Sequence, residues 1–218
     1  MTYTVKELFY TLQGEGAQTG RAAVFCRFAG CNFWSGREAD RETSLCPFCD
    51  TDFVGADGAG GGKFKEADSL AQAINSAWTA AAGKTNLLTR AVRPYVVFTG
   101  GEPLLQLDQA LIEKLHEQGF EIGIETNGSI EVPAGIDWIC VSPKDLNQLK
   151  QRSGQELKLL FPLAHLPPED FIQMDFDYFY LQPLEAAGCD HTGEVVQYCL
   201  RHPQWRVALQ THKLLNIP

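Results

Sequence analysis

The sequence lacks any long apolar run: no stretch of its 218 residues approaches the roughly 18–20 apolar residues that a membrane-spanning helix needs. It also lacks an excess of basic residues, because 18 Lys and Arg are set against 27 Asp and Glu, giving a net charge of −9. Coating a nucleic acid or an anionic membrane requires clustered positive charge. We therefore expect no nucleic-acid partner and no membrane partner.

The first residues show no basic segment followed by an apolar one, which a secretory leader would require, and no repeat of fixed period occurs. We therefore expect a cytoplasmic protein, in which the seven cysteines do not form a disulfide framework. Unevenly spaced cysteines in that setting indicate metal binding or catalysis for some and core packing for others. The length and the 44% hydrophobic composition predict one globular domain spanning residues 1–218.

Apolar runs alternate with helical patterns along most of the chain. Helices are predicted near residues 70–81, 108–118 and 192–200, and a flexible glycine-rich loop at 54–62. An extended piece at 5–12 precedes the predicted strands, which lie at 21–29, 94–99, 120–125, 137–142, 156–161, 177–182 and 205–210. Strands joined by crossovers pair in parallel, and the helices are too few for a closed eight-fold barrel. We predict an α/β fold: an open, partial TIM-like barrel of parallel strands with few helices.

Three cysteines, Cys31, Cys46 and Cys49, follow the first predicted strand with C-x14-C-x2-C spacing. A structural zinc ion would need a fourth ligand, and no histidine lies at zinc-finger spacing. Incidental cysteines would suit a less polar stretch than CPFCDTD. The third interpretation is a four-iron cluster held by three cysteines, which leaves one iron open to a small molecule. The TGGEP run at 99–103 ends the next predicted strand and favours this interpretation, because its glycines allow a ligand to approach the backbone.

The remaining cysteines are expected to play no part in this site. Cys26 and Cys140 lie inside apolar strands, and Cys199 lies on the apolar face of a helix, so all three are predicted core residues. Cys189 lies in a turn-like AAGCD segment and receives no assignment. Alanine at Cys140 is accordingly expected to spare the chemistry and at most to lower stability.

The three-cysteine loop and the TGGEP run resemble those of the radical S-adenosylmethionine superfamily. Most members space their cysteines as C-x3-C-x2-C, whereas this chain inserts residues 32–45, which we expect to form a small helical or looped excursion. Further motifs are LQGEG at 12–16, RFAGCN at 27–32, CDTDF at 49–53, TGGEPLLQ at 99–106, ETNGS at 125–129, SPK at 142–144, LQP at 181–183 and QTHKLLNIP at the end. Scattered over nearly the whole chain, they together resemble the 7-carboxy-7-deazaguanine synthase family.

This resemblance implies a lyase that converts 6-carboxy-5,6,7,8-tetrahydropterin to 7-carboxy-7-deazaguanine with loss of ammonia, on the route to queuosine in tRNA. It implies a [4Fe-4S] cluster, S-adenosylmethionine and Mg2+ as cofactors. Reductive cleavage of S-adenosylmethionine would yield a 5′-deoxyadenosyl radical that takes a hydrogen atom from the substrate and later returns it. A one-electron donor of flavodoxin type and a homodimer are implied only in the same way.

The resemblance also assigns cofactor residues. Cys31, Cys46 and Cys49 would hold the cluster, and the Thr51 hydroxyl would bind Mg2+, although Thr51 could instead only cap the turn. Lys144 could instead be an ordinary surface lysine. The positions that would contact S-adenosylmethionine are Phe48, Cys49, Asp50, Gly101, Ser142, Pro143, Lys144, Gln182, Pro183, Leu184 and Glu185.

The remaining matched positions would contact the substrate. A guanidinium pairs bidentately with a carboxylate, which suits Arg27, although a lone strand arginine could also form a surface ion pair. The terminal carboxylate of Pro218 would reach the substrate if the tail folds inward, and His212 could otherwise be an exposed tail residue. The full set is Leu12, Gln13, Gly14, Glu15, Arg27, Thr99, Glu125, His212 and Pro218.

Two other functions stay open at this level. One is an activase that installs a glycyl radical on a partner protein, and the other is a non-catalytic zinc-binding module. The LQGEG motif, the threonine after Cys-Asp and the QTHK tail favour a small acidic heterocycle over a protein substrate. A brown colour that dithionite bleaches would exclude zinc.

Overall fold

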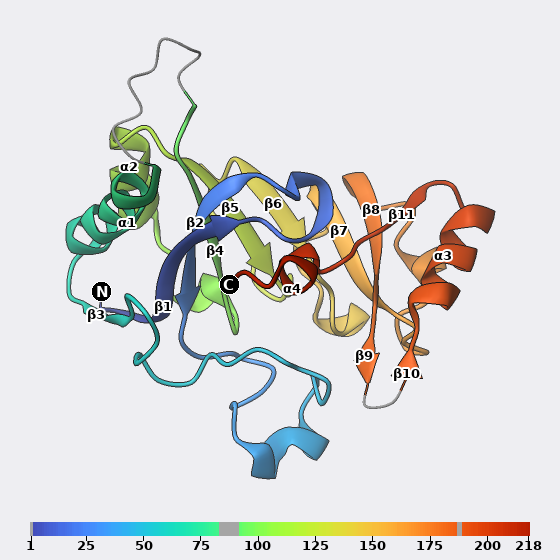
Figure 1. The fold of residues 1–218 in the computed structure, drawn as a ribbon. Helices are drawn as coiled ribbons and strands as arrows, with labels where there is room; N and C mark the ends of the chain where they lie inside the picture. Colours follow the sequence, from blue (N-terminus) through green and yellow to red (C-terminus); the bar gives the residue numbers. More distant parts are fainter. Residues whose placement is uncertain (1, 83–91, 187–188) are drawn as a thin grey trace.

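The structure, a computed structural model, describes residues 2–82, 92–186 and 189–218. Its main sheet has nine strands in the order β11-β8-β7-β6-β5-β4-β2-β1-β3 (Figure 1). The pairs that run from β2 across the sheet to β11 are all parallel. The strands are β1 (Tyr3–Leu12), β2 (Ala22–Phe28), β3 (Gly62–Phe64), β4 (Tyr95–Gly100), β5 (Glu121–Thr126), β6 (Trp138–Val141), β7 (Ser153–Phe161), β8 (Asp175–Pro183) and β11 (Trp205–Val207). The predicted open, partial barrel with few helices is confirmed.

One edge of the sheet departs from the parallel expectation. The extended piece at 5–12 is a full strand, β1, which pairs antiparallel with β2, and the short strand β3 pairs antiparallel with β1. Only residues 13–21 connect β1 to β2. A parallel pair needs a crossover of a dozen or more residues, so this short connection dictates the antiparallel arrangement.

The helices of the described chain are α1 (Ala67–Ala82), α2 (Gln109–Glu117), α3 (Thr192–Arg201) and the short α4 (Thr211–Leu215). In Figure 1, α1 and α2 lie together near one end of the sheet and α3 lies at the β8–β11 end. The Asp108 side chain begins α2 by accepting a hydrogen bond from the Leu111 N–H at 3.1 Å. Short 3-10 turns are η1 (Gly16–Gln18), η2 (Glu38–Thr43), η3 (Pro103–Leu105), η4 (Leu146–Gln148) and η5 (Pro168–Asp170), and a separate ribbon pairs β9 (Glu185–Ala186) with β10 (Cys189–Asp190).

Two apolar clusters hold these layers together. In the first, Ile74 of α1 and Leu111 of α2 are fully buried against β1, β2, β4 and β5. In the second, Val195 of α3 packs with Trp205 beside β7 and β8. Each such side chain contributes about 1.5–3 kcal/mol of transfer free energy. The predicted core cysteines follow this pattern: Cys26 and Cys140 are buried, while Cys199 is half-buried against the second cluster.

Two predicted segments differ in detail. The strand expected at 205–210 ends at Val207, and residues 208–210 leave the sheet toward α4. The loop at 54–62 is attached to β1 rather than free, because the Gly58 N–H donates to Lys6 O at 2.9 Å and Leu8 N–H donates to Ala59 O at 2.8 Å. A Cβ atom at Gly60 would lie 2.4 Å from Leu8 O, so a glycine here lets the loop backbone come close to β1.

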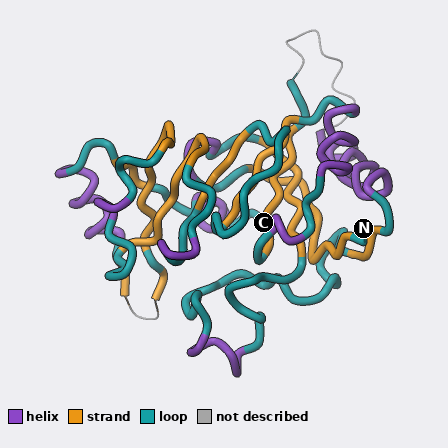
Figure 2. Tube along the Cα trace, turned by 180° about the vertical axis from the view of Figure 1, so that it is seen from behind, coloured by secondary structure: helices purple, strands orange, loops and turns teal. Residues whose placement is uncertain are grey.

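The insertion at 32–45 forms the expected excursion, which contains the 3-10 turn η2 and projects from the sheet (Figure 2). Inside it the Arg41 guanidinium stacks over Trp34 and donates to the carbonyl of Cys49 at 2.8 Å. The excursion is thereby tied to the turn that carries two of the three cysteines. None of the helices described combines the length and the hydropathy that crossing a bilayer would require.

Candidate functional site

A single cavity of about 460 Å³ gathers residues from both ends of the sequence. Its wall combines the cysteine loop, the C-terminal ends of β4 to β8, the loop after β1 and the C-terminal tail. All candidate metal and substrate residues line it, as do most cofactor candidates. These residues are Leu12, Gln13, Gly14, Glu15, Arg27, Cys31, Cys46, Phe48, Cys49, Asp50, Thr51, Thr99, Gly101, Glu125, Ser142, Lys144, Gln182, His212 and Pro218.

Four cofactor candidates lie off this wall. Pro143 is buried between two residues that do line the cavity, and Pro183 ends β8. Leu184 donates its N–H to Phe161 O at 2.8 Å. Glu185 is exposed and pairs with Lys213 of α4 at 2.6 Å. The assignment of these four positions to S-adenosylmethionine therefore stays a prediction.

The three candidate cluster ligands all line the cavity. Burial raises the pKa of the Cys46 thiol to about 12; Lys144 acts against this rise, and Cys31 and Cys49 add to it. Thiols that influence one another in this way lie close together, and a bound metal would displace their protons. Among the residues that the structure describes, no three His, Cys, Asp or Glu side chains converge as ligands of a single metal ion. Three thiols on one cavity wall are the donors that an iron–sulfur cluster takes, whereas a structural zinc ion would need a fourth ligand.

The backbone at the end of β4 lies directly against the first cysteine. A Cβ atom at Gly101 would lie 2.3 Å from Gly30 O and 2.5 Å from Cys31 Cβ, so only glycine allows this approach. The next residue, Glu102, is fully buried and accepts hydrogen bonds from the Thr126 hydroxyl and the Asn127 N–H, both at 2.8 Å. Burial raises the pKa of Glu102. The TGGEP run therefore joins the ends of β4 and β5 beside the cysteine loop.

A cationic group lies on the β2 side of the cavity. Arg27 donates through Nε to Glu7 Oε1 at 2.7 Å, the one hydrogen bond that its guanidinium makes within the described chain. A guanidinium carries five N–H donors, so its terminal groups can serve an anion in the cavity. On strand β1, Lys6 pairs with Asp52 at 2.8 Å and fixes the segment that follows Thr51.

The C-terminal tail is docked against β1, and Figure 1 shows it crossing in front of the sheet. The Thr11 hydroxyl donates to the Pro218 carbonyl oxygen at 2.8 Å, and both the N–H and the hydroxyl of Thr211 donate to Gly14 O at 2.8 Å. Lys213 pairs with Asp50 at 3.2 Å. The tail thus connects the loop after β1 to the cysteine loop.

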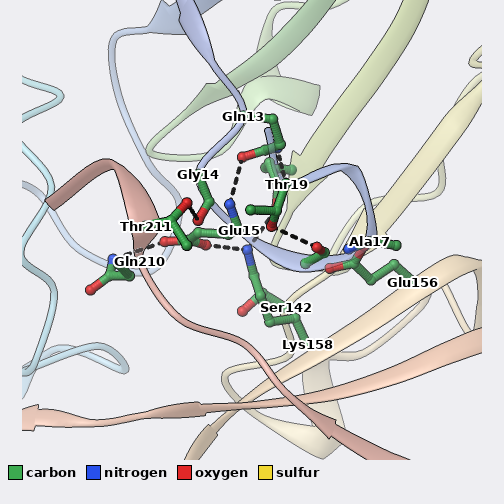
Figure 3. Close-up of polar contacts among 12 residues, drawn as sticks. Gln13, Gly14, Glu15, Ala17, Thr19, Ser142, Glu156, Lys158, Gln210 and Thr211 are labelled. Atoms are coloured by element: carbon green, nitrogen blue, oxygen red, sulfur yellow. Dashed lines mark hydrogen bonds and ion pairs between the residues drawn. The ribbon is translucent and has the colours of Figure 1, made fainter. Parts of the chain in front are cut away.

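Sequence reasoning missed two buried charged residues of β7, Glu156 and Lys158. Lys158 donates to Glu15, and Glu156 accepts the Ala17 N–H at 3.0 Å (Figure 3). Lys158 also donates to Glu125 at 3.1 Å. The sequence did hold a signal for these two residues. Glu156 and Lys158 are two residues apart in the otherwise apolar ELKLLF strand, so their side chains lie on the same face of the sheet.

Glu156 makes the stability of the fold depend on pH. Burial and the Glu125 carboxylate raise the pKa of Glu156 from 4.5 to about 7, so the folded protein holds a proton that the unfolded chain releases near pH 4.5. Stability that comes from this group is therefore lost as pH rises between these values. We expect Glu156→Gln to be more stable than the wild type at pH 8, by on the order of 2 kcal/mol, and nearly equal to it at pH 4.5.

Urea unfolding at both pH values measures this difference. The exposed residue Glu131 provides the matched control, Glu131→Gln, for which no such pH-dependent gain is expected. A stability difference between Glu156→Gln and the wild type that stays constant across the range would contradict the assignment.

No family model matches the chain. It is, however, similar over its whole length to curated proteins named 7-carboxy-7-deazaguanine synthase. It is 58% identical to those of Bordetella pertussis and Caulobacter vibrioides, with 100% of each chain covered in both comparisons. The crystal structure of QueE from Escherichia coli superposes with a TM-score of 0.63 at 25% identity, covering 96% of this chain and 94% of that one. The chain therefore belongs to the 7-carboxy-7-deazaguanine synthase family.

Proposed function

We propose that this chain is an enzyme that converts 6-carboxy-5,6,7,8-tetrahydropterin to 7-carboxy-7-deazaguanine with loss of ammonia, in queuosine biosynthesis. Membership of the family implies radical S-adenosylmethionine chemistry. One observation carries the proposal: a single cavity holds three thiols, a guanidinium and two carboxylates with free acceptor positions. The thiols suit the cofactor, the guanidinium suits an anionic substituent of the substrate, and the carboxylates suit a heterocycle edge that carries N–H donors.

In this proposal Cys31, Cys46 and Cys49 bind a [4Fe-4S] cluster. When bound, the cluster and S-adenosylmethionine together supply the radical that takes a hydrogen atom from the substrate. The glycine backbone at Gly101 makes room for the cofactor beside Cys31. Ser142 and Lys144, which are joined by a 2.6 Å hydrogen bond, offer polar groups to its sugar.

The substrate carboxylate is assigned to Arg27 and to a Mg2+ ion at the Thr51 hydroxyl. Magnesium keeps several waters and accepts few protein oxygens, so one hydroxyl together with a ligand carboxylate is a physically sufficient site. Glu15 and Glu125 then accept hydrogen bonds from the opposite, N–H-bearing edge of the ring. The docked tail with His212 and Pro218 covers the cavity and keeps water from the reacting atoms.

The dimensions of the cavity favour a small-molecule substrate over a partner protein. A volume of about 460 Å³ lies within the range of pockets for small ligands. A glycyl-radical activase would have to admit a polypeptide segment instead. A one-electron donor of flavodoxin type and a homodimeric assembly belong to the proposal through the family resemblance alone.

Turnover of the reconstituted enzyme tests the reaction. The protein is loaded anaerobically with iron and sulfide, then supplied with dithionite, S-adenosylmethionine, Mg2+ and 6-carboxy-5,6,7,8-tetrahydropterin. We expect 7-carboxy-7-deazaguanine and ammonia in equal amounts, and slower formation without Mg2+. S-adenosylmethionine cleavage without any deazapurine product would overturn the proposed substrate.

A further inference from the structure

Lys158 lines the cavity, and its ammonium lies between two carboxylates. Its side chain is 7% exposed, whereas those of Glu15 and Glu125 are 17% and 21% exposed. The Lys158 Nζ donates to one oxygen of each, at 3.1 Å for Glu125. Lys158 is thus the most enclosed of the three side chains, and the two carboxylates are more accessible than the ammonium between them.

A second donor fixes the other oxygen of each carboxylate. Gln210 donates to Glu15 Oε1 at 2.8 Å (Figure 3). Gln13 donates to Glu125 Oε1 at 3.0 Å. Gln13 in turn accepts the Glu15 N–H at 3.1 Å. A carboxylate can accept about four hydrogen bonds, so both groups keep acceptor positions while their orientation is set. The pair is therefore a preorganised acceptor for a ligand that presents neighbouring N–H groups.

The electrostatics show what Lys158 contributes. Burial acts to raise the pKa of Glu15, and the Lys158 ammonium overrides it, leaving that pKa below its usual value. Burial acts to lower the pKa of Lys158, but Glu125 and Glu15 hold it well above its usual value. The Lys158 ammonium therefore keeps the enclosed Glu15 carboxylate charged, and the same ammonium is hydrogen-bonded to Glu125.

Other titratable groups surround the lysine. They come from the loop after β1, β5, β6 and its following loop, β7 and the tail. These groups are Glu15, Glu125, Cys140, Lys144, Glu156 and His212. Among them Lys158 alone is a cation that donates directly to both Glu15 and Glu125.

We propose that Lys158 is a positioning residue that holds Glu15 and Glu125 as paired, oriented acceptors for the N–H edge of the bound heterocycle. The proposal rests on the proposed function, and it adds a specificity requirement to it. A ring whose corresponding edge carries acceptors in place of N–H donors would meet two fixed negative charges and be rejected. A cyclic guanidine-like or amide edge, by contrast, would be bound.

Replacement of Lys158 by methionine tests the proposal, because methionine keeps similar length without the charge. We expect KM for 6-carboxy-5,6,7,8-tetrahydropterin to rise at least about tenfold at pH 7, with kcat changing much less. The acid limb of the kcat/KM profile should move to higher pH, because Glu15 without the neighbouring ammonium holds its proton to higher pH. The KM for S-adenosylmethionine should change less than about twofold.

Two comparisons keep this result decisive. Lys150→Met, at an exposed lysine, is the matched control and should leave both KM values and the pH profile unchanged. If Lys158→Met does not fold, the same change is made in Glu156→Gln, which removes one buried carboxylate, and is compared with Glu156→Gln itself. An unchanged pterin KM together with an unmoved acid limb would refute the role of Lys158. Absence of turnover in the wild type would instead refute the proposed function.

Discussion

Replacing Cys46 by alanine is expected to abolish turnover, by at least about a thousandfold, and to prevent stable iron incorporation. Cys46 lines the cavity together with Cys31 and Cys49, and with one thiolate removed the remaining two cannot hold a cluster with a single open position. Iron and sulfide content, visible absorbance and product formation are measured on protein reconstituted in parallel with the wild type.

Cys199→Ala is the matched control, because Cys199 is half-buried on α3 and lies off the cavity wall. It should keep the wild-type iron content and turnover, with only a small loss of stability. Full iron content and activity in Cys46→Ala would show that the cluster is held elsewhere.

Arg27→Gln is expected to lower kcat/KM for the pterin by about a hundredfold, chiefly through KM. Arg27 lines the cavity and is anchored to Glu7 at 2.7 Å through Nε, which leaves its other donors available to a carboxylate. A neutral amide would offer that carboxylate neither charge nor bidentate geometry. Steady-state kinetics at saturating S-adenosylmethionine measure the change.

Arg21→Gln is the comparison that separates binding from folding. Arg21 lies just before β2, donates to both oxygens of Glu121 at 2.7 Å, stacks over Tyr95 and does not line the cavity. Its replacement should lower the unfolding temperature while leaving the pterin KM near the wild-type value. Equal KM effects in the two variants would remove Arg27 from substrate recognition.

Much of this fold could be predicted from the sequence because buried parallel strands form short apolar runs. The run PYVVFT, for example, became β4, with Val96 and Phe98 fully buried. The direction of β1 was harder to predict, because an amphipathic strand has the same period whether its neighbour is parallel or antiparallel. The early end of β11 at Val207 follows from the turn toward the tail, a tertiary requirement that local propensity does not encode.

The site residues also divide into those that local sequence patterns predict and those that only the folded structure reveals. Cysteine spacing and glycine-rich strand ends are local patterns, and the positions that they marked line one cavity. Lys158 and Glu156 carried no motif, because their importance depends on Glu15 and Glu125, which are distant in sequence. Pro183, Leu184 and Glu185 followed a matched segment at the end of β8 and are not among the residues that line the cavity, so their cofactor role stays a prediction.

The central claim is a cluster held by three cysteines with one iron left for S-adenosylmethionine. Electron paramagnetic resonance of the anaerobically reconstituted, dithionite-reduced enzyme, recorded with and without S-adenosylmethionine, tests it most directly. We expect about four irons per chain and a reduced [4Fe-4S] signal that changes shape when S-adenosylmethionine binds. A signal that S-adenosylmethionine leaves untouched, or a colourless protein that carries one zinc ion, would contradict the account.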